Sequence, residues 1–212
     1  MGKTRTGNVA IGLTMIGFIF VLIAFTTPNW LQTDGKLTSP KFRKIGLWQV
    51  CFEDFTDTQH LYDTKFNNCW WVFEEEYYIL HDLLLPTFFV ATQFMFTMCF
   101  TLILIGIFLT ALYGCCSRQQ QKFQLLLWTN GTILTLSGLA GIIAVLIFGC
   151  RGDYRDWMPN WQHNDIGWSY AVGVVGSFTV LTAGILFLVE GRRHMKKFER
   201  MYNEDQKTHT TI

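Results

Sequence analysis

The sequence predicts a membrane protein: a left-handed bundle of four transmembrane helices that carries a small extracellular β-sheet. Half of the 212 residues are hydrophobic, and only 16% are charged. Four stretches contain no Asp, Glu, Lys or Arg, and each is longer than the roughly 20 residues that cross a bilayer. Small residues recur within these stretches at a spacing that suits close helix packing, or alternatively a face for lateral dimers. The stretches are Thr6–Thr33, Leu83–Ser117, Phe123–Cys150 and Ile166–Val189; the small-residue pairs are Ser137/Gly141, Ala140/Ala144 and Gly173/Ser177.

The first charge-free stretch is expected to be an uncleaved span. Lys3 and Arg5 precede it, as basic residues precede the apolar part of a signal peptide. However, its apolar part is long for a signal peptide, and "TTPNW" lacks the small residues of a cleavage site. The predicted organisation is one domain, residues 1–212, with spans at about residues 8–27, 84–113, 123–148 and 167–189, an extracellular segment 28–82, a second extracellular loop 149–166 and a tail 190–212.

The basic residues are divided unevenly between the two sides of the membrane. The amino terminus, the turn after the second span and the tail together carry ten basic and four acidic residues, against seven and twelve on the other side. The tail opens with "EGRRHMKKFER", a dense basic cluster directly after the fourth span. The positive-inside rule therefore predicts that both termini are cytoplasmic. Residues 28–82 then face an oxidising compartment.

The extracellular segment contains a pair of cysteines, Cys51 and Cys69. An even pair in an oxidising compartment predicts a disulfide, which stabilises by roughly 3 kcal/mol in the chain-entropy model. A zinc site would need His60 and a fourth ligand as well, and the short spacing of metal ligands is absent. Cys150, at the outer mouth of the third span, is expected to be a reduced thiol or to pair with another chain.

Strand-forming residues occupy most of the extracellular segment. "NWLQTD", "FRKIGLWQVCF" and "NNCWWVF" are rich in β-branched and aromatic residues, and "EDFTDTQ" between the last two is typical of a turn. "EEEYYILHDLLLP" is interpreted as a helix that leads into the second span, with Pro86 near its first turn. Trp30 and Trp48 are expected at the membrane–water boundary or in the core of the small sheet.

The spans exclude several classes of function. An ionisable side chain inside a membrane normally marks transport or catalysis, and the four stretches hold no acid, base or histidine. His81 and Asp82, at the outer edge of the second span, are interpreted as interfacial polar residues rather than as a catalytic pair. The patterns GxSxG, HExxH and the P-loop are absent. We therefore expect a non-enzymatic protein without a cofactor, metal or nucleic-acid partner, embedded in the lipid bilayer.

Two features on the cytoplasmic side suggest modification or binding. Cys115 and Cys116 lie where the second span leaves the membrane, which suits S-palmitoylation, although ordinary buried thiols would fit equally well. The chain ends in Thr210, Thr211 and Ile212. PDZ domains bind such ends by adding the peptide as a strand and enclosing the last apolar side chain. A cytoplasmic PDZ scaffold is therefore an expected partner.

The order of four features resembles the W–GLW–C–C signature of the claudin superfamily. Trp30 is followed by Gly46, Leu47 and Trp48, then by Cys51 and Cys69, all between the first two of four spans. "NDIGWSYAVG" is similar to the family's entry into the fourth span. The stretch from "CWWVFEEEYY" onward resembles insect claudin-like septate-junction proteins such as megatrachea. One departure is the interval between the two cysteines, which is longer than in most vertebrate claudins.

The resemblance implies a plasma-membrane protein of cell–cell junctions. Its loops would meet copies of itself or related claudin-like proteins, within one membrane and across the gap, and form a paracellular barrier. The alternatives are an auxiliary, gamma-like subunit of an ion channel or receptor, and an adhesion factor similar to myelin and epithelial membrane proteins. The extracellular segment has a net charge of −4. If a conducting path exists, acids such as Asp54, Asp57 and Asp63 are expected to favour cations; the alternative is that they only solvate a loop.

Overall fold

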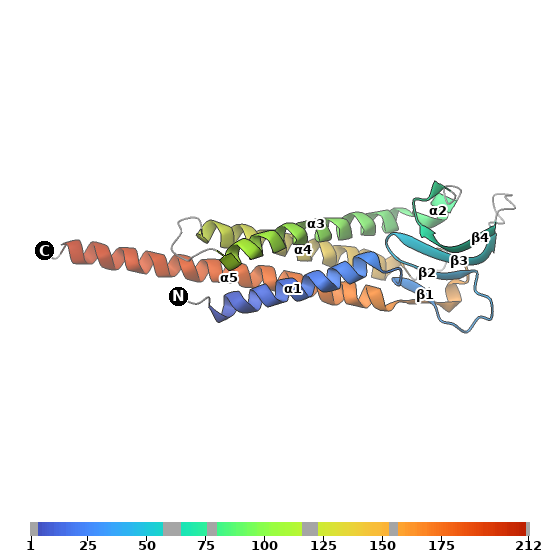
Figure 1. Cartoon of the computed structure of the whole chain (residues 1–212), viewed down its shortest axis with the longest axis horizontal. Coiled ribbons are helices and arrows are strands. Elements are labelled where there is room, and N and C mark those ends of the chain that lie inside the picture. The colour runs from blue at the N-terminus through green and yellow to red at the C-terminus, as the bar shows by residue number, and fades with distance from the viewer. Residues whose placement is uncertain (1–3, 57–64, 76–79, 116–122, 153–156, 211–212) are drawn as a thin grey trace.

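A computed structural model of the chain describes residues 4–56, 65–75, 80–115, 123–152 and 157–210. Four long helices run side by side, and a small sheet covers one end of the bundle (Figure 1). Helix α1 begins and helix α5 ends on the side away from the sheet. Within the described residues, four helices are long and apolar enough to cross a membrane, which confirms the predicted fold class. They are α1 (Arg5–Thr26), α3 (Thr87–Cys115), α4 (Phe123–Arg151) and α5 (Trp168–Thr210).

The membrane-spanning parts of the helices are apolar on all sides, as expected of helices that face lipid as well as each other. Large side chains point outward from the bundle: Phe94 is 63% exposed, Phe108 64% and Leu125 66%. A protein in water rarely exposes such a continuous apolar surface. These side chains are therefore the lipid-facing surface of a membrane bundle.

Small residues allow the helices to approach each other closely within the chain. A Cβ atom built on Gly138 of α4 would lie 2.5 Å from the backbone nitrogen of Leu181 in α5. The Ser137 hydroxyl donates a hydrogen bond to the Cys99 carbonyl of α3 at 2.8 Å. The small pairs singled out in the sequence thus pack inside the bundle: Gly141 faces Ser177 and Cys99, and Ala144 is fully buried.

The sheet is antiparallel, with strand order β4-β3-β2-β1-β5. The three strand-rich stretches of the extracellular segment supply four of its strands. The fifth, β5, comes from the second loop and was not predicted, because a run this short has no recognisable alternation. The strands are β1 (Leu31–Thr33), β2 (Phe42–Ile45), β3 (Gln49–Thr56), β4 (Lys65–Trp71) and β5 (Asn164–Ile166).

Two helical segments differ from the sequence interpretation. Of the helix expected before the second span, the described residues contain the short α2 (His81–Leu84), and residues 76–79 lie outside them. Residues 190–212 were expected to form a cytoplasmic tail after the fourth span, and α5 continues through this tail without a break to Thr210. Residues 190–210 contain no proline, and Gly191 is their only glycine. Nothing in this stretch therefore stops a helix that has already formed.

One face of the sheet packs on the outer ends of the helices and forms the extracellular core. Val50, Phe52 and Phe55 of β3 are buried, whereas Gln49 and Asp54 on the same strand are exposed. Phe42 packs edge-to-face on Phe52 at a ring distance of 6.1 Å. This face continues the apolar interior of the bundle, so the sheet and the helices share one core.

We predict that Gly138→Ala destabilises the bundle by about 1–3 kcal/mol, because the added methyl group would force the backbones of α4 and α5 apart. Gly12→Ala in α1 is the matched control, since a Cβ there meets nothing within 4 Å. That change should be neutral or slightly stabilising, because alanine is the better helix former. Thermal unfolding of the two purified variants in one detergent tests the difference. Equal unfolding temperatures would contradict the close approach at Gly138.

Candidate functional site: the extracellular sheet and its anchors

Trp30 lies where the sheet meets all four long helices. Its side chain is fully buried, and its indole N–H donates a hydrogen bond to the Ala24 carbonyl of α1 at 2.7 Å. The ring makes edge-to-face contacts with Phe96 of α3, Phe148 of α4 and Tyr170 of α5, at 5.1, 5.0 and 5.8 Å. Such contacts contribute beyond the area they bury. Trp30 therefore lies in the shared core rather than at the membrane–water boundary.

The Gly46–Leu47–Trp48 turn anchors the sheet to α1 and α3. A Cβ on Gly46 would lie 2.5 Å from the Pro28 Cα atom, so a side chain has no room there. The Leu47 carbonyl accepts a hydrogen bond from the Gln93 side-chain amide of α3 at 2.6 Å. Sequence reasoning missed Gln93; an amide near the outer end of an apolar span is the signal that could have found it.

A disulfide joins β3 to β4, as the cysteine pair predicted. Cys51 and Cys69 are direct partners in the strand register, with their Cα atoms 4.0 Å apart. The bond uses both thiols, so they are not zinc ligands. His60, the third residue of the zinc alternative, lies outside the described residues, among which no group of three His, Cys, Asp or Glu side chains could hold a metal. The disulfide therefore has a structural role: it fixes the strand that forms one edge of the sheet.

A polar contact joins the second loop to the first extracellular segment. The backbone N–H of Asp34 donates to the His163 carbonyl at 2.7 Å, and the His163 ring nitrogen Nδ1 lies 3.1 Å from the Asp34 carboxylate. The Lys36 backbone N–H donates to the same carboxylate at 2.9 Å. This last hydrogen bond, followed by the one with His163, lowers the pKa of Asp34 below its usual value of 3.8. We call this group, Asp34, Lys36 and His163, the loop latch.

Trp157 ties the second loop to the bundle at another point. Its indole N–H donates to the Leu83 carbonyl of α2 at 3.0 Å, and its ring packs edge-to-face on Phe88 at 5.0 Å. Together with β5 and the loop latch, this contact makes the second loop part of the same rigid unit as the sheet. Sequence reasoning had treated it as a separate loop.

The predicted selectivity acids are only partly described. Asp54 is exposed in a β-bulge at the end of β3 that is farther from the bundle, with a φ of 46°. Its carboxylate lies 3.9 Å from the Lys65 ammonium, and its backbone N–H donates to the Asn67 side chain at 2.7 Å. Asp57 and Asp63 lie outside the described residues. The neighbouring Glu53 forms an ion pair with Arg43 at 2.7 Å.

The comparison with known families covers the bundle and the sheet together. Residues 15–189 match the family described as PMP-22/EMP/MP20/Claudin tight junction, which spans more than half of the chain. The chain belongs to this family. Its members are structural membrane proteins without enzymatic activity. No curated protein gives a significant individual match.

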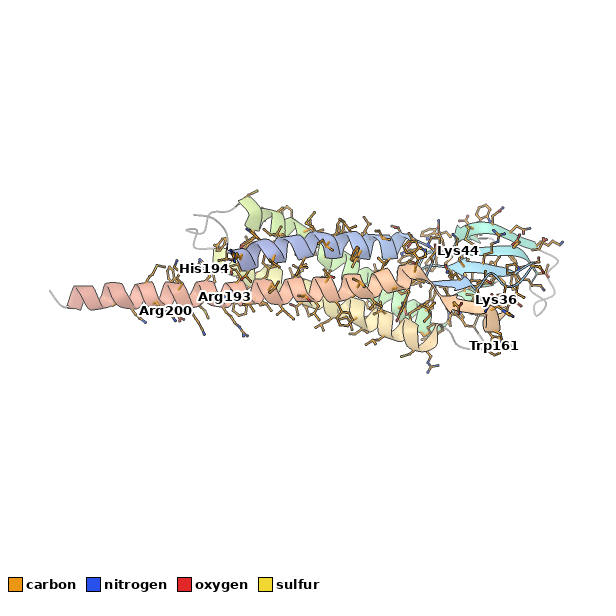
Figure 2. All side chains as sticks on the ribbon, turned by 90° about the horizontal axis from the view of Figure 1, so that it is seen from below. Lys36, Lys44, Trp161, Arg193, His194 and Arg200 are labelled. Atoms are coloured by element: carbon orange, nitrogen blue, oxygen red, sulfur yellow. A yellow bond between two sulfur atoms is a disulfide. The ribbon has the colours of Figure 1, made fainter. Side chains whose placement is uncertain are left out.

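In this claudin-family chain, α5 extends beyond the other helices on the side away from the sheet. Arg193 donates a hydrogen bond to the Thr6 hydroxyl of α1 at 2.8 Å, and the Arg192 guanidinium lies 6.0 Å from the centre of the Trp128 ring. Figure 2 shows Arg193, His194 and Arg200 along the part of α5 that extends away from the sheet. The sequence had shown the basic cluster, but the contacts of Arg192 and Arg193 with other helices required the fold.

Of the residues proposed for acylation and PDZ binding, the structure describes Cys115 and Thr210, each at the end of a helix. Cys115 is the exposed last residue of α3, and Cys116 lies outside the described residues. Thr210 is the last residue of α5, and Thr211 and Ile212 also lie outside. Cys99, not considered from the sequence, is a buried thiol of the bundle, and Cys150 is exposed on α4. The structure does not bring the acylation and PDZ candidates into one site.

We predict that the loop latch stabilises this claudin-family fold at neutral pH and loses that effect in acid. Because folding lowers the pKa of Asp34, the contribution is fully present above the unfolded value of 3.8 and disappears as the pH falls through the folded value. Asp34→Asn should therefore lower the melting temperature at pH 7, and the difference from the native protein should shrink below pH 3.8. Thermal unfolding across this pH range is the measurement.

Asp165→Asn is the matched control for this prediction. Asp165 is an exposed acid on β5, two residues after His163, so the control makes the same chemical change outside the loop latch. It should leave the melting temperature unchanged. If both variants lose the same stability at every pH, general surface charge rather than the loop latch is responsible.

Proposed function

We propose that this chain is a claudin-like component of cell–cell junctions whose extracellular sheet forms or organises a paracellular barrier. The observation that carries the proposal is the joining of both extracellular segments into one sheet. Strand β1 pairs with β2 on one side and with β5 of the second loop on the other. A rigid surface of this kind, fixed to the membrane bundle by Trp30 and Gln93, can bind another protein with little loss of conformational entropy.

The proposed partners are copies of this chain or related claudin-like proteins, in the same membrane and in the opposite one. Family membership supports this choice. The long aromatic stretch after Cys69, which resembles insect septate-junction proteins, favours a septate or tight junction as the location. The sheet also has edge strands at both ends of its order, β4 and β5. An edge strand offers unpaired backbone groups to another protein.

The tail is proposed to bind a PDZ scaffold through Thr210, Thr211 and Ile212. The 43 residues of α5 span about 65 Å at 1.5 Å per residue, against roughly 30 Å for the hydrocarbon core of a bilayer. The carboxyl end therefore stands clear of the membrane surface, where a scaffold can reach it. Because PDZ domains bind an extended strand, the last turn of α5 would have to unwind on binding.

Expression in epithelial cells that lack their own barrier-forming claudins tests the proposed function. The protein should collect at cell contacts and raise the electrical resistance of the cell layer. A variant without Ile212 should reach the surface and keep its fold, but lose binding to a junctional PDZ scaffold. Uniform surface distribution with no change in resistance would contradict the barrier role. Co-purification with a pore-forming channel subunit would instead support the auxiliary-subunit alternative.

The charge proposal is tested by changing Asp54, Asp57 and Asp63 together to Asn. If these acids line a conducting path, the ratio of sodium to chloride permeability should fall by roughly twofold, because counter-ion enrichment extends over only about 8 Å in physiological salt. Arg43 and Lys65 pair with acids of the same region, which keeps the expected effect small. Asp165→Asn serves as the control. An unchanged ratio with the triple variant still at junctions would remove these acids from selectivity.

A further inference from the structure

A row of aromatic side chains runs from the bundle onto the edge of the sheet. Phe25, in the last turn of α1, lies 5.3 Å from Trp48, ring centre to ring centre. Trp48 lies 6.3 Å from Phe73, which follows β4, and Phe73 lies 5.8 Å from Trp71, the last residue of β4. We call Trp48, Phe73 and Trp71 the aromatic ridge. Its outer members remain exposed, Trp71 at 53% and Phe73 at 45%.

The aromatic ridge is continuous with a row of half-buried rings between α1 and α3. Phe25 stacks on Phe100 of α3 at 4.4 Å, and Phe100 in turn stacks on Phe18, two turns deeper in α1, at 6.4 Å. The outer end of α1 therefore leads directly to Trp48 through touching rings. The apolar run of α1 also ends near Thr26, so we place the start of the ridge near the outer boundary of the hydrocarbon core.

Backbone hydrogen bonds hold the aromatic ridge at this height. The Val72 N–H donates to the Trp48 carbonyl at 2.8 Å, which fixes the end of β4 beside the Gly46–Leu47–Trp48 turn. That turn is itself bonded to α3 through Gln93. The ridge therefore cannot swing away from the membrane unless the sheet leaves the bundle.

The neighbouring residues define how deep the aromatic ridge can lie. Trp71 is followed by a turn in which the Glu74 N–H donates to the Trp71 carbonyl at 3.0 Å, and Glu75 is exposed. A carboxylate in hydrocarbon is costly, so the acids keep this segment out of the apolar core. Tryptophan rings are enriched in the headgroup layer, where the ring contacts apolar groups and the N–H remains hydrated. The exposed rings of Trp71 and Phe73, with an exposed acid close behind them, therefore match the headgroup layer.

We propose that Trp71 and Phe73, backed by the half-buried ring of Trp48, insert into the outer headgroup layer of the protein's own membrane. This contact holds the membrane-proximal end of β4 against the lipid surface and fixes the tilt of the sheet above it. It also distinguishes the two ends of β4. The end at Trp71 binds lipid, while Lys65, beside Asp54, is at the opposite end of the strand. The proposal does not depend on the barrier function.

Fluorescence quenching of the full-length protein in lipid nanodiscs tests this proposal. The chain has 8 tryptophans, so the Trp71 signal is obtained as the difference between the native protein and Trp71→Phe. Lipids brominated near the headgroup should reduce this difference signal by about half, and lipids brominated near the end of the acyl chain should reduce it less. Aqueous iodide should quench it weakly. Matching unfolding temperatures of the two proteins show that the variant is folded.

Trp161→Phe is the matched control. Trp161 is 37% exposed in the short 3-10 helix of the second loop, and Figure 2 shows it beyond the outer ends of the helices. Its signal should respond to iodide and not to brominated lipid. The proposal is overturned if Trp71 behaves like Trp161. It is equally overturned if Trp71 becomes protected from iodide only when two membranes are brought together, because the ridge would then be a protein–protein contact.

Discussion

The burial of one indole ring, that of Trp30, holds the extracellular and membrane parts of this protein together. Four helix ends and the first strand converge on it, and its N–H has a carbonyl partner within the same core. The flanking backbone is used as well: the Trp30 N–H donates to Ile45 of β2, and its carbonyl accepts from Gly167 beside β5. A smaller or non-planar side chain would leave a cavity and an unpaired carbonyl at the point where the helices depend on one another.

The two halves of the fold are stabilised by different means because their solvents differ. In the bilayer, the hydrophobic effect does not drive the helices together, because the lipid tails are as apolar as the helix surfaces. Close packing at Gly138 and the hydrogen bond from Ser137 to Cys99 hold them together instead. Outside the membrane, burial of Phe42, Phe52 and Val50 is favourable again. That core is small, and the Cys51–Cys69 disulfide adds stability that burial within the five-stranded sheet does not supply alone.

Several contacts act together to fix the height and orientation of the sheet relative to the helix bundle. Gln93 fixes the sheet to α3, Trp157 fixes the second loop to α2, and the loop latch closes the β1–β5 side. The aromatic ridge extends the same constraint to the lipid surface. The position of each residue on the sheet is therefore fixed relative to the membrane-spanning helices, as the proposed junction role would require.

The sequence by itself determined the membrane class, the family signature and the disulfide, because each depends on local features. A bilayer requires about 20 uncharged residues wherever they occur, and a cysteine pair in an oxidising compartment forms a bond whatever surrounds it. Only the tertiary structure revealed β5, the loop latch and the pairing of Asp54 with Lys65. The latch joins Asp34 to His163, which lie 129 residues apart, and neither residue carries a local signal for the other. The length of α5 could not be predicted from the pattern of hydrophobicity either. The bilayer limits where the apolar residues end, but it does not limit where the helix ends.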